Sequence, residues 1–151
     1  MKRTASAVWK GGLQDGRGTV STASGVLSNT PYNFRMRFEN EKGTNPEELV
    51  AAAHAACFSM ALSLFLGQAG MTADSIETKA TVSLDQVDGG FTVTSSHLET
   101  NVKIPNADKA AFEKAVETAK SGCPISKLLS AKITLDEIGR ASCRERVYVL
   151  V

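Results

Sequence analysis

The stretch LVAAAHAACFSMALSLFL, residues 49–66, decides how this chain folds, because it contains no Asp, Glu, Lys or Arg. A helix that is apolar on nearly every side must be covered on every side. The stretch approaches the length of a membrane span, but its many alanines, two serines and one histidine favour a core helix in a soluble protein. One domain of this size could hardly cover such a helix, so we also expect a dimer.

The residues before this stretch predict where the helix begins. Asn45 is a favoured capping residue, and Pro46 suits the first helical position. Glu47 and Glu48 place negative charge in the first turn, where the helix dipole stabilises it. We therefore expect one long helix that starts near residue 46 and ends near Gly67.

Composition limits the function classes. The chain has 151 residues, enough for one domain with a core. Its formal net charge of +1 gives no reason to expect a nucleic-acid partner. Met1-Lys2-Arg3 is followed by Thr, Ala and Ser instead of an apolar run, so no signal peptide is predicted and a cytoplasmic location is expected.

Alternating apolar and polar residues predict strands on both sides of the central helix. The expected strands are residues 4–9, 18–28, 32–38, 75–87, 91–104 and 132–136. Asp88-Gly89-Gly90 predicts a hairpin turn. A shift in the apolar phase of the strand that follows predicts a β-bulge near residues 95–97.

Two further helices are expected after this hairpin. One begins near Asp108 and turns a single apolar face inward, formed by Phe112, Ala115, Val116 and Ala119. The other is short and begins at Pro124. The predicted order is β-β-β-α-β-β-α-α-β, an α+β domain with antiparallel sheets around a long central helix.

The domain is expected to cover residues 1–136. Residues 137–151, EIGRASCRERVYVLV, lack the earlier patterning and are interpreted as a non-native tail, although YVLV could add a strand. Cys143 lies in this tail and is left out of the chemistry.

Three cysteines, at positions 57, 123 and 143, form neither a disulfide framework nor a C-x-x-C pair. Cys57 is either a small core residue or a reactive thiol. Cys123 precedes Pro124, where a helix N-terminus favours a thiolate, but it could also serve only as a cap.

His54 lies three residues before Cys57 on the same helix face. The pair could support a nucleophilic hydrolase, but we prefer a core histidine that hydrogen-bonds its surroundings. A zinc site made from His54, Cys57 and Cys123 matches no common motif. His97 is expected at the surface or in the bulge.

Arg37 and Glu47 complete the candidates. They form either an ordinary surface ion pair, worth little, or a cation that stabilises a thiolate together with a carboxylate that orients the cation.

The segment PYNFRMRFENEKGTNPEELVAAAHAACFSMALSLFL resembles the central signature of the OsmC/Ohr family, and SGCPISKLL resembles the family's second cysteine motif. GTVSTASGVL and VSLDQVDGGF are similar to the OsmC branch. The resemblance covers roughly residues 5–136. It implies an intertwined α+β homodimer without metal or prosthetic group.

The resemblance also implies a cytoplasmic thiol peroxidase of oxidative and osmotic stress defence. Cys57 would be the peroxidatic nucleophile and Cys123 the resolving thiol, while Arg37 holds the thiolate and Glu47 orients Arg37. The substrates would be organic hydroperoxides, with hydrogen peroxide reduced less well. The reductant would be an external dithiol, often lipoyl-based. We expect Phe58, Met60 and Leu62 to give the site an apolar lining.

Glu47 precedes Cys57 by ten residues, about 15 Å along one straight helix, which a Glu side chain cannot bridge. Either Arg37 bridges the two residues or Glu47 comes from the partner chain, and we favour the partner chain, with Arg37 also contributed across the interface. The alternative function is a non-catalytic redox-sensing or binding protein that uses the same cysteine pair.

Overall fold

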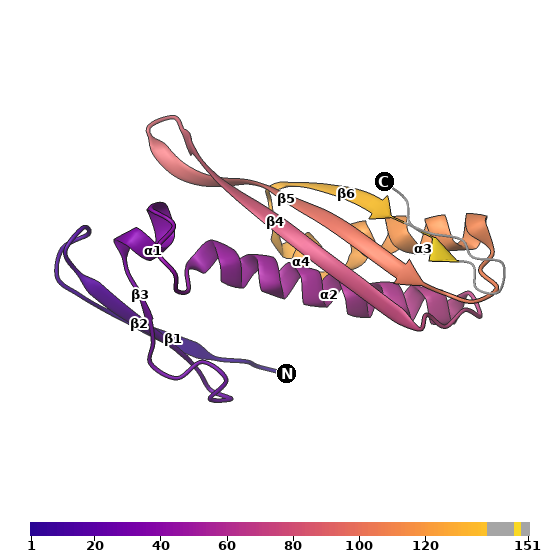
Figure 1. The fold of residues 1–151 in the computed structure, drawn as a ribbon, viewed down its shortest axis with the longest axis horizontal. Coiled ribbons are helices and arrows are strands. Elements are labelled where there is room, and N and C mark those ends of the chain that lie inside the picture. The colour runs from indigo at the N-terminus through magenta and orange to yellow at the C-terminus, as the bar shows by residue number, and fades with distance from the viewer. Residues whose placement is uncertain (139–146, 149–151) are drawn as a thin grey trace. The chain divides into compact units, whose positions relative to one another are not determined.

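The computed structural model describes residues 1–138 and 147–148. The chain forms two compact units, Met1–Leu49 and Val50–Val151 (Figure 1). Its elements are β1 (Ala5–Lys10), β2 (Arg17–Thr22), β3 (Thr30–Tyr32), α1 (Phe34–Phe38), α2 (Pro46–Gln68), β4 (Ser75–Val87), β5 (Gly90–Lys103), α3 (Lys109–Gly122), α4 (Pro124–Leu128), β6 (Lys132–Ile138) and β7 (Val147–Tyr148).

The first unit contains a three-stranded antiparallel sheet in the order β1-β2-β3. The rings of Trp9 and Tyr32 lie 5.5 Å apart, centroid to centroid. Gly18 fits beside them because a Cβ there would lie 2.5 Å from the Tyr32 ring and 2.7 Å from the Trp9 ring. The second strand ends at Thr22, earlier than the predicted residue 28.

The prediction of a strand at residues 32–38 is wrong, because Phe34–Phe38 forms helix α1. Asn33 caps this helix, since its Oδ1 accepts a hydrogen bond of 2.8 Å from the backbone N–H of Met36. The rings of Phe34 and Phe38, four residues apart, pack with centroids 4.9 Å apart. The alternation of aromatic and polar residues therefore did not identify a strand here.

In the second unit, β4 pairs antiparallel with β5, and the register shifts between Ser83 and Leu84. The shift leaves Thr94 without a register partner, so the bulge predicted at 95–97 lies one residue earlier. The sheets are not wholly antiparallel as expected, because β6 pairs parallel with β5. The connection between the two strands explains this. Helices α3 and α4 return the chain to the end of the sheet where β5 begins, so β6 runs in the same direction as β5.

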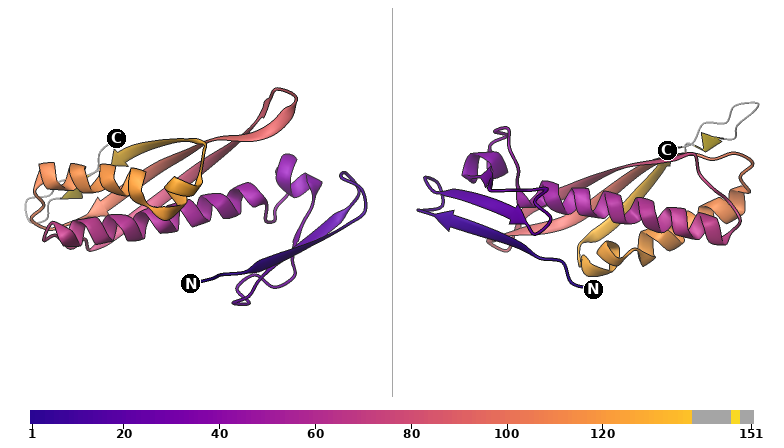
Figure 2. Two further views of the ribbon diagram at one scale, coloured as in Figure 1. Left: turned by 180° about the vertical axis from the view of Figure 1, so that it is seen from behind. Right: turned by 90° about the horizontal axis from the view of Figure 1, so that it is seen from below.

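Helices α2 and α3 lie on the same face of this sheet (Figure 2). The predicted apolar face of α3 is confirmed, since Phe112, Ala115, Val116 and Ala119 are all buried. Helix α2 contributes a stripe of residues spaced four apart, namely His54, Phe58, Leu62 and Leu66. From β5, the even-numbered residues Ser96, Leu98, Thr100 and Val102 face the same core.

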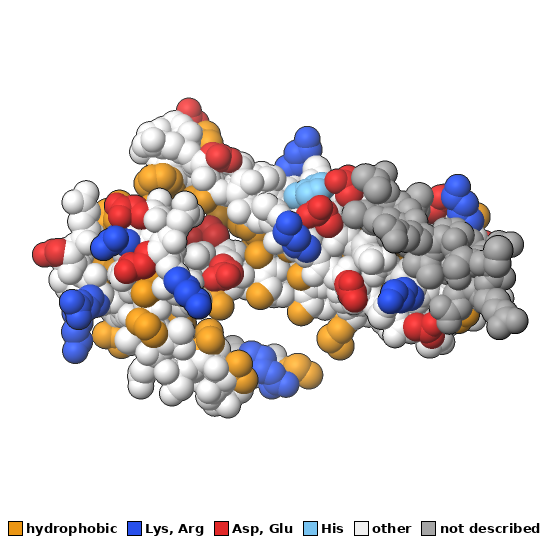
Figure 3. Space-filling model, in the orientation of Figure 1, with side chains coloured by type: hydrophobic (Ala, Val, Ile, Leu, Met, Phe, Trp, Pro, Cys, Tyr) orange, Lys and Arg blue, Asp and Glu red, His pale blue; other side chains and the backbone are white. Residues whose placement is uncertain are grey.

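Helix α2 begins as predicted, because the Oδ1 of Asn45 accepts a 2.8 Å hydrogen bond from the N–H of Glu48. By length and composition α2 could cross a membrane, but its buried stripe packs in the core of the second unit. Some of its other apolar side chains are exposed, including Met60 at 77% and Leu64 at 58%, whereas Ala61 and Phe65 are partly buried against the core. Hydrophobic side chains are visible at the surface along α2 in Figure 3.

Cys143 lies outside the described residues, as does most of the segment 137–151 that we interpret as a non-native tail. Residues 137 and 138 extend β6, and β7 pairs antiparallel with β5. The interpretation of this segment stays a prediction.

Candidate active site

The second unit brings two cysteines together that are far apart in the sequence. Cys57 lies in α2, and Cys123 lies between α3 and α4 as the cap of both helix ends. The backbone N–H of Ile125 donates a 3.5 Å hydrogen bond to the Sγ of Cys57. The Sγ of Cys123 accepts from the N–H of Ser126 at 3.3 Å. Both sulfurs therefore meet the first turn of α4, and both are free thiols.

The two sulfurs differ in exposure. Cys57 is partly exposed, whereas Cys123 is fully buried. The more deeply buried sulfur is therefore the one between α3 and α4, not the one on the central helix. A small molecule that reaches this site from solvent meets Cys57 first.

Burial raises the pKa of the Cys57 thiol, while the hydrogen bond from Ile125 lowers it. The neighbouring Cys123 raises the pKa of Cys57 further, both through a hydrogen bond and through charge. No Lys or Arg among residues 50–138 contributes to this pKa. A cation near the sulfur would favour the thiolate form.

His54 is fully buried and lies between two serines. Its Nδ1 is 2.7 Å from the Oγ of Ser96, and its Nε2 is 2.8 Å from the Oγ of Ser126. Burial lowers the pKa of His54, so the imidazole is neutral near pH 7. The predicted core histidine is confirmed. Its two contacts are serine hydroxyls, which gives no support to the Cys–His pair of a hydrolase.

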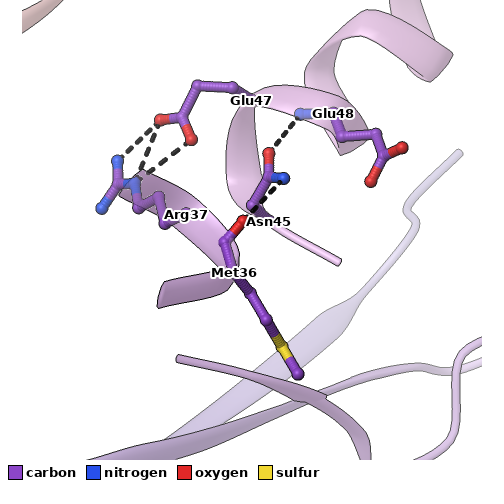
Figure 4. Close-up of polar contacts among 5 residues, drawn as sticks. All are labelled: Met36, Arg37, Asn45, Glu47 and Glu48. Carbon is purple, nitrogen blue, oxygen red and sulfur yellow. Dashed lines mark hydrogen bonds and ion pairs between the residues drawn. The ribbon is translucent and has the colours of Figure 1, made fainter. Parts of the chain in front are cut away.

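Arg37 and Glu47 meet in the first unit (Figure 4). The Nη2 of Arg37 lies 2.7 Å from Oε1 of Glu47, and its Nε lies 3.1 Å from Oε2. This two-point geometry is the strong form of an Arg–carboxylate pair. The Arg37 side chain is 36% exposed and that of Glu47 is 13% exposed. The remaining guanidinium edge can therefore still bind another group.

Some sequence expectations for the site do not fit these positions. Phe58 and Leu62 are core residues and Met60 is exposed, so the three do not form one lining. His97 contacts Thr134 and Asp136 on the neighbouring strand, away from both cysteines. Within the described residues, no group of three His, Cys, Asp or Glu could hold a metal ion.

Sequence reasoning missed Ser126 and Ser96. The only available signal was that Ser126 stands three residues after Cys123, the spacing of a capping contact. Nothing in the local sequence connects Ser96 with His54, because only the folded sheet brings them together.

The family model for OsmC-like proteins matches residues 39–137. The chain belongs to the OsmC-like protein family. It is 57% identical to the peroxiredoxin OsmC of Escherichia coli strain K12 over 134 residues, which cover 89% of this chain and 94% of that relative.

Solved structures show the same OsmC-like fold. The crystal structure of the organic hydroperoxide resistance protein OhrB of Bacillus subtilis is 30% identical, with a TM-score of 0.65 over 87% of this chain and 96% of that one. An OsmC-like protein from Vibrio cholerae gives a TM-score of 0.70 over 90% and 98% of the two chains, at 17% identity. The α+β OsmC-like fold is thereby confirmed, and the homodimer stays a prediction.

Proposed function

We propose that this OsmC-like chain is a cysteine-based peroxidase that reduces organic hydroperoxides in stress defence. The activity is supported by two of its relatives, a peroxiredoxin and an organic hydroperoxide resistance protein. One observation carries the mechanism: a partly exposed thiol and a fully buried thiol meet at one helix turn.

Cys57 acts as the nucleophile, because it is the thiol that solvent reaches. Its thiolate attacks one oxygen of the hydroperoxide, the O–O bond breaks, and the other oxygen leaves as an alcohol after protonation. Cys57 becomes a sulfenic acid. The thiol of Cys123 then attacks that sulfur, so a disulfide forms and water leaves.

Arg37 supplies a cation that favours the Cys57 thiolate. A guanidinium stays protonated at any working pH, and Glu47 holds it by two hydrogen bonds. Ten residues of helix separate Glu47 from Cys57, about 15 Å. We therefore assign Arg37 and Glu47 to the Cys57 of the partner chain in a homodimer.

The exposed face of α2 supports the homodimer. Met60 and Leu64 lie on it, one helical turn apart, and both are large apolar side chains in contact with solvent. A second copy of the chain would cover this face. The same dimer would be cytoplasmic and would need no prosthetic group, because an external dithiol, lipoyl-based for example, returns the disulfide to two thiols.

The test measures hydroperoxide consumption by the purified Cys143→Ser protein with dithiothreitol or dihydrolipoamide. We expect turnover of cumene and tert-butyl hydroperoxide, and slower turnover of hydrogen peroxide. Adding Cys57→Ser should abolish the activity. Adding Cys123→Ser should allow one turnover, after which Cys57 is oxidised further and the enzyme stops.

Equal consumption with and without Cys57 would contradict the proposal. A single oxidation to the disulfide that no dithiol reverses would instead favour the redox-sensing alternative. His54→Gln separates the peroxidase from a Cys–His hydrolase in the first oxidation step, because a peroxidase should still form the Cys57 sulfenic acid at the parental rate, whereas a hydrolase would need His54 to activate Cys57.

A further inference from the structure

Four buried side chains are connected by hydrogen bonds in a chain that begins at the resolving thiol, Cys123. The Sγ of Cys123 donates to the Oγ of Ser126 at 3.1 Å, and that Oγ lies 2.8 Å from Nε2 of His54. Nδ1 of His54 lies 2.7 Å from the Oγ of Ser96. All four residues are buried, and His54, Ser96 and Cys123 have no exposed surface. The peroxidase mechanism described above uses only Cys123.

One direction of hydrogen bonding satisfies all three of these contacts. When the Cys123 thiol donates to Ser126, the hydroxyl of Ser126 is free to donate to Nε2 of His54. The Nδ1–H of the neutral imidazole then donates to Ser96. A hydroxyl that accepts on one side and donates on the other is suited to pass a proton.

We propose that Ser126 and His54 form a proton relay for Cys123 during disulfide formation. Ser126 is a catalytic residue, because it touches the reacting sulfur. His54 is a positioning residue that acts through Ser126. This inference rests on the proposed function, in which Cys123 attacks the Cys57 sulfenic acid.

The relay balances the step. As the Cys123 sulfur bonds to the Cys57 sulfur, the S–O bond of the sulfenic acid breaks, so Cys123 is oxidised and Cys57 is reduced. The thiol proton moves to the Oγ of Ser126 while the proton of Ser126 moves to Nε2 of His54. The proton returns through Ser126 to the departing hydroxide, which leaves as water.

The groups around His54 keep this relay simple. Its hydrogen-bond partners are the uncharged hydroxyls of Ser96 and Ser126. Burial lowers the pKa of His54, and no charged side chain in the described part of the chain contributes to that shift. The imidazole of His54 is therefore held between two hydroxyls, and no carboxylate of the described residues is hydrogen-bonded to it.

The experiment follows one turnover in the Cys143→Ser background. The reduced protein is mixed with one equivalent of cumene hydroperoxide and quenched at intervals, and intact mass separates the sulfenic acid from the disulfide. The variants are His54→Gln, which keeps hydrogen-bonding groups but cannot take up a proton, and Ser126→Ala. His97→Gln is the matched control, because His97 neighbours Ser96 in β5 but contacts Thr134 and Asp136 instead.

We expect both variants to form the sulfenic acid at the parental rate and the disulfide roughly 100-fold more slowly, the lower range for general acid–base catalysis. His97→Gln should match the parent. The parental rate of disulfide formation should also fall at acid pH as His54 takes up a proton, and His54→Gln should lose this dependence.

Parental disulfide formation and an unchanged pH profile in His54→Gln would overturn the relay. If His54→Gln does not fold, Ser126→Ala decides in the same way, because it removes the link and leaves His54 in place. If hydroperoxide never oxidises Cys57 in the parental protein, the proposed peroxidase function itself is wrong. If Cys57 is oxidised normally and the variants form the disulfide at the parental rate, only the relay is wrong.

Discussion

At the scale of single residues, the protonation of His54 makes the stability of the fold depend on pH. Folding buries its imidazole and lowers its pKa, whereas the unfolded chain has the usual histidine value of about 6.5. As the pH falls below that value, the unfolded chain takes up the proton first. The stabilisation by neutral His54 is therefore complete above about pH 6.5 and is lost as the pH falls toward the lower folded pKa.

We predict that the free energy of unfolding falls more steeply with acid in the parent than in His54→Gln. The extra slope should approach 1.4 kcal/mol per pH unit, about one proton, in this range. Urea denaturation of both proteins at about pH 7.5 and about pH 5 measures it. The contributions of all other titrating groups are the same in the two proteins and cancel in the difference. Equal slopes would therefore show that His54 binds its proton equally well in the folded and the unfolded chain.

The sequence predicted which cysteines meet but not how deeply each is buried. The local patterns left each cysteine open, as a core residue or a cap, and the pairing of Cys57 with Cys123 came from the resemblance to the OsmC/Ohr family. Their exposure depends on how α3 and α4 pack, which no local pattern shows. Ser96 was beyond reach for the same reason, since it meets His54 only across the folded core.

At the scale of elements, α2 stabilises the second unit through its buried stripe. We predict that Leu62→Ala, a change at a fully buried position, lowers the free energy of unfolding by about 2–5 kcal/mol, because it removes apolar contact and leaves a cavity. Leu128→Ala is the matched control, because Leu128 is 73% exposed in the same unit. Urea unfolding compares the two, and equal losses would show that α2 does not anchor this core.

Helix α2 and the hairpin of β4 and β5 were predictable because their signals are long and consistent. Asn45 and Pro46 mark the helix start, and the alternation in β4 runs through most of the strand. The alternation at residues 32–38 is as regular as that in β4, but it is short. A helix forms there instead, with Asn33 as its N-terminal cap. Parallel pairing of β6 was missed because periodicity gives no strand direction.

At the scale of the whole molecule, the proposed dimer places each cation in the partner's site. Mixing Cys57→Ser chains with Arg37→Gln chains tests this. Each variant alone should be inactive. A mixed dimer has one site with both Cys57 and Arg37 only if the guanidinium crosses the interface, so the mixture should regain roughly a quarter of the parental activity.

An inactive mixture in which native mass spectrometry detects mixed dimers would place Arg37 in the site of its own chain. Sedimentation of the parent as a monomer at all concentrations would contradict the dimer itself. A mixture of Cys57→Ser with Cys57→Ser,Arg37→Gln is the control, because no pairing of these chains supplies the nucleophile.

The parallel pairing of β5 with β6 also has a consequence during synthesis. Cys123 belongs to the crossover that joins these strands, and contacts between distant segments form late because a long loop must close first. A ribosome-bound nascent chain therefore displays Cys57 before its resolving partner is in place. A disulfide between the two cysteines can therefore form only after the crossover has been made and packed, so a chain oxidised to this disulfide is one whose second unit is complete.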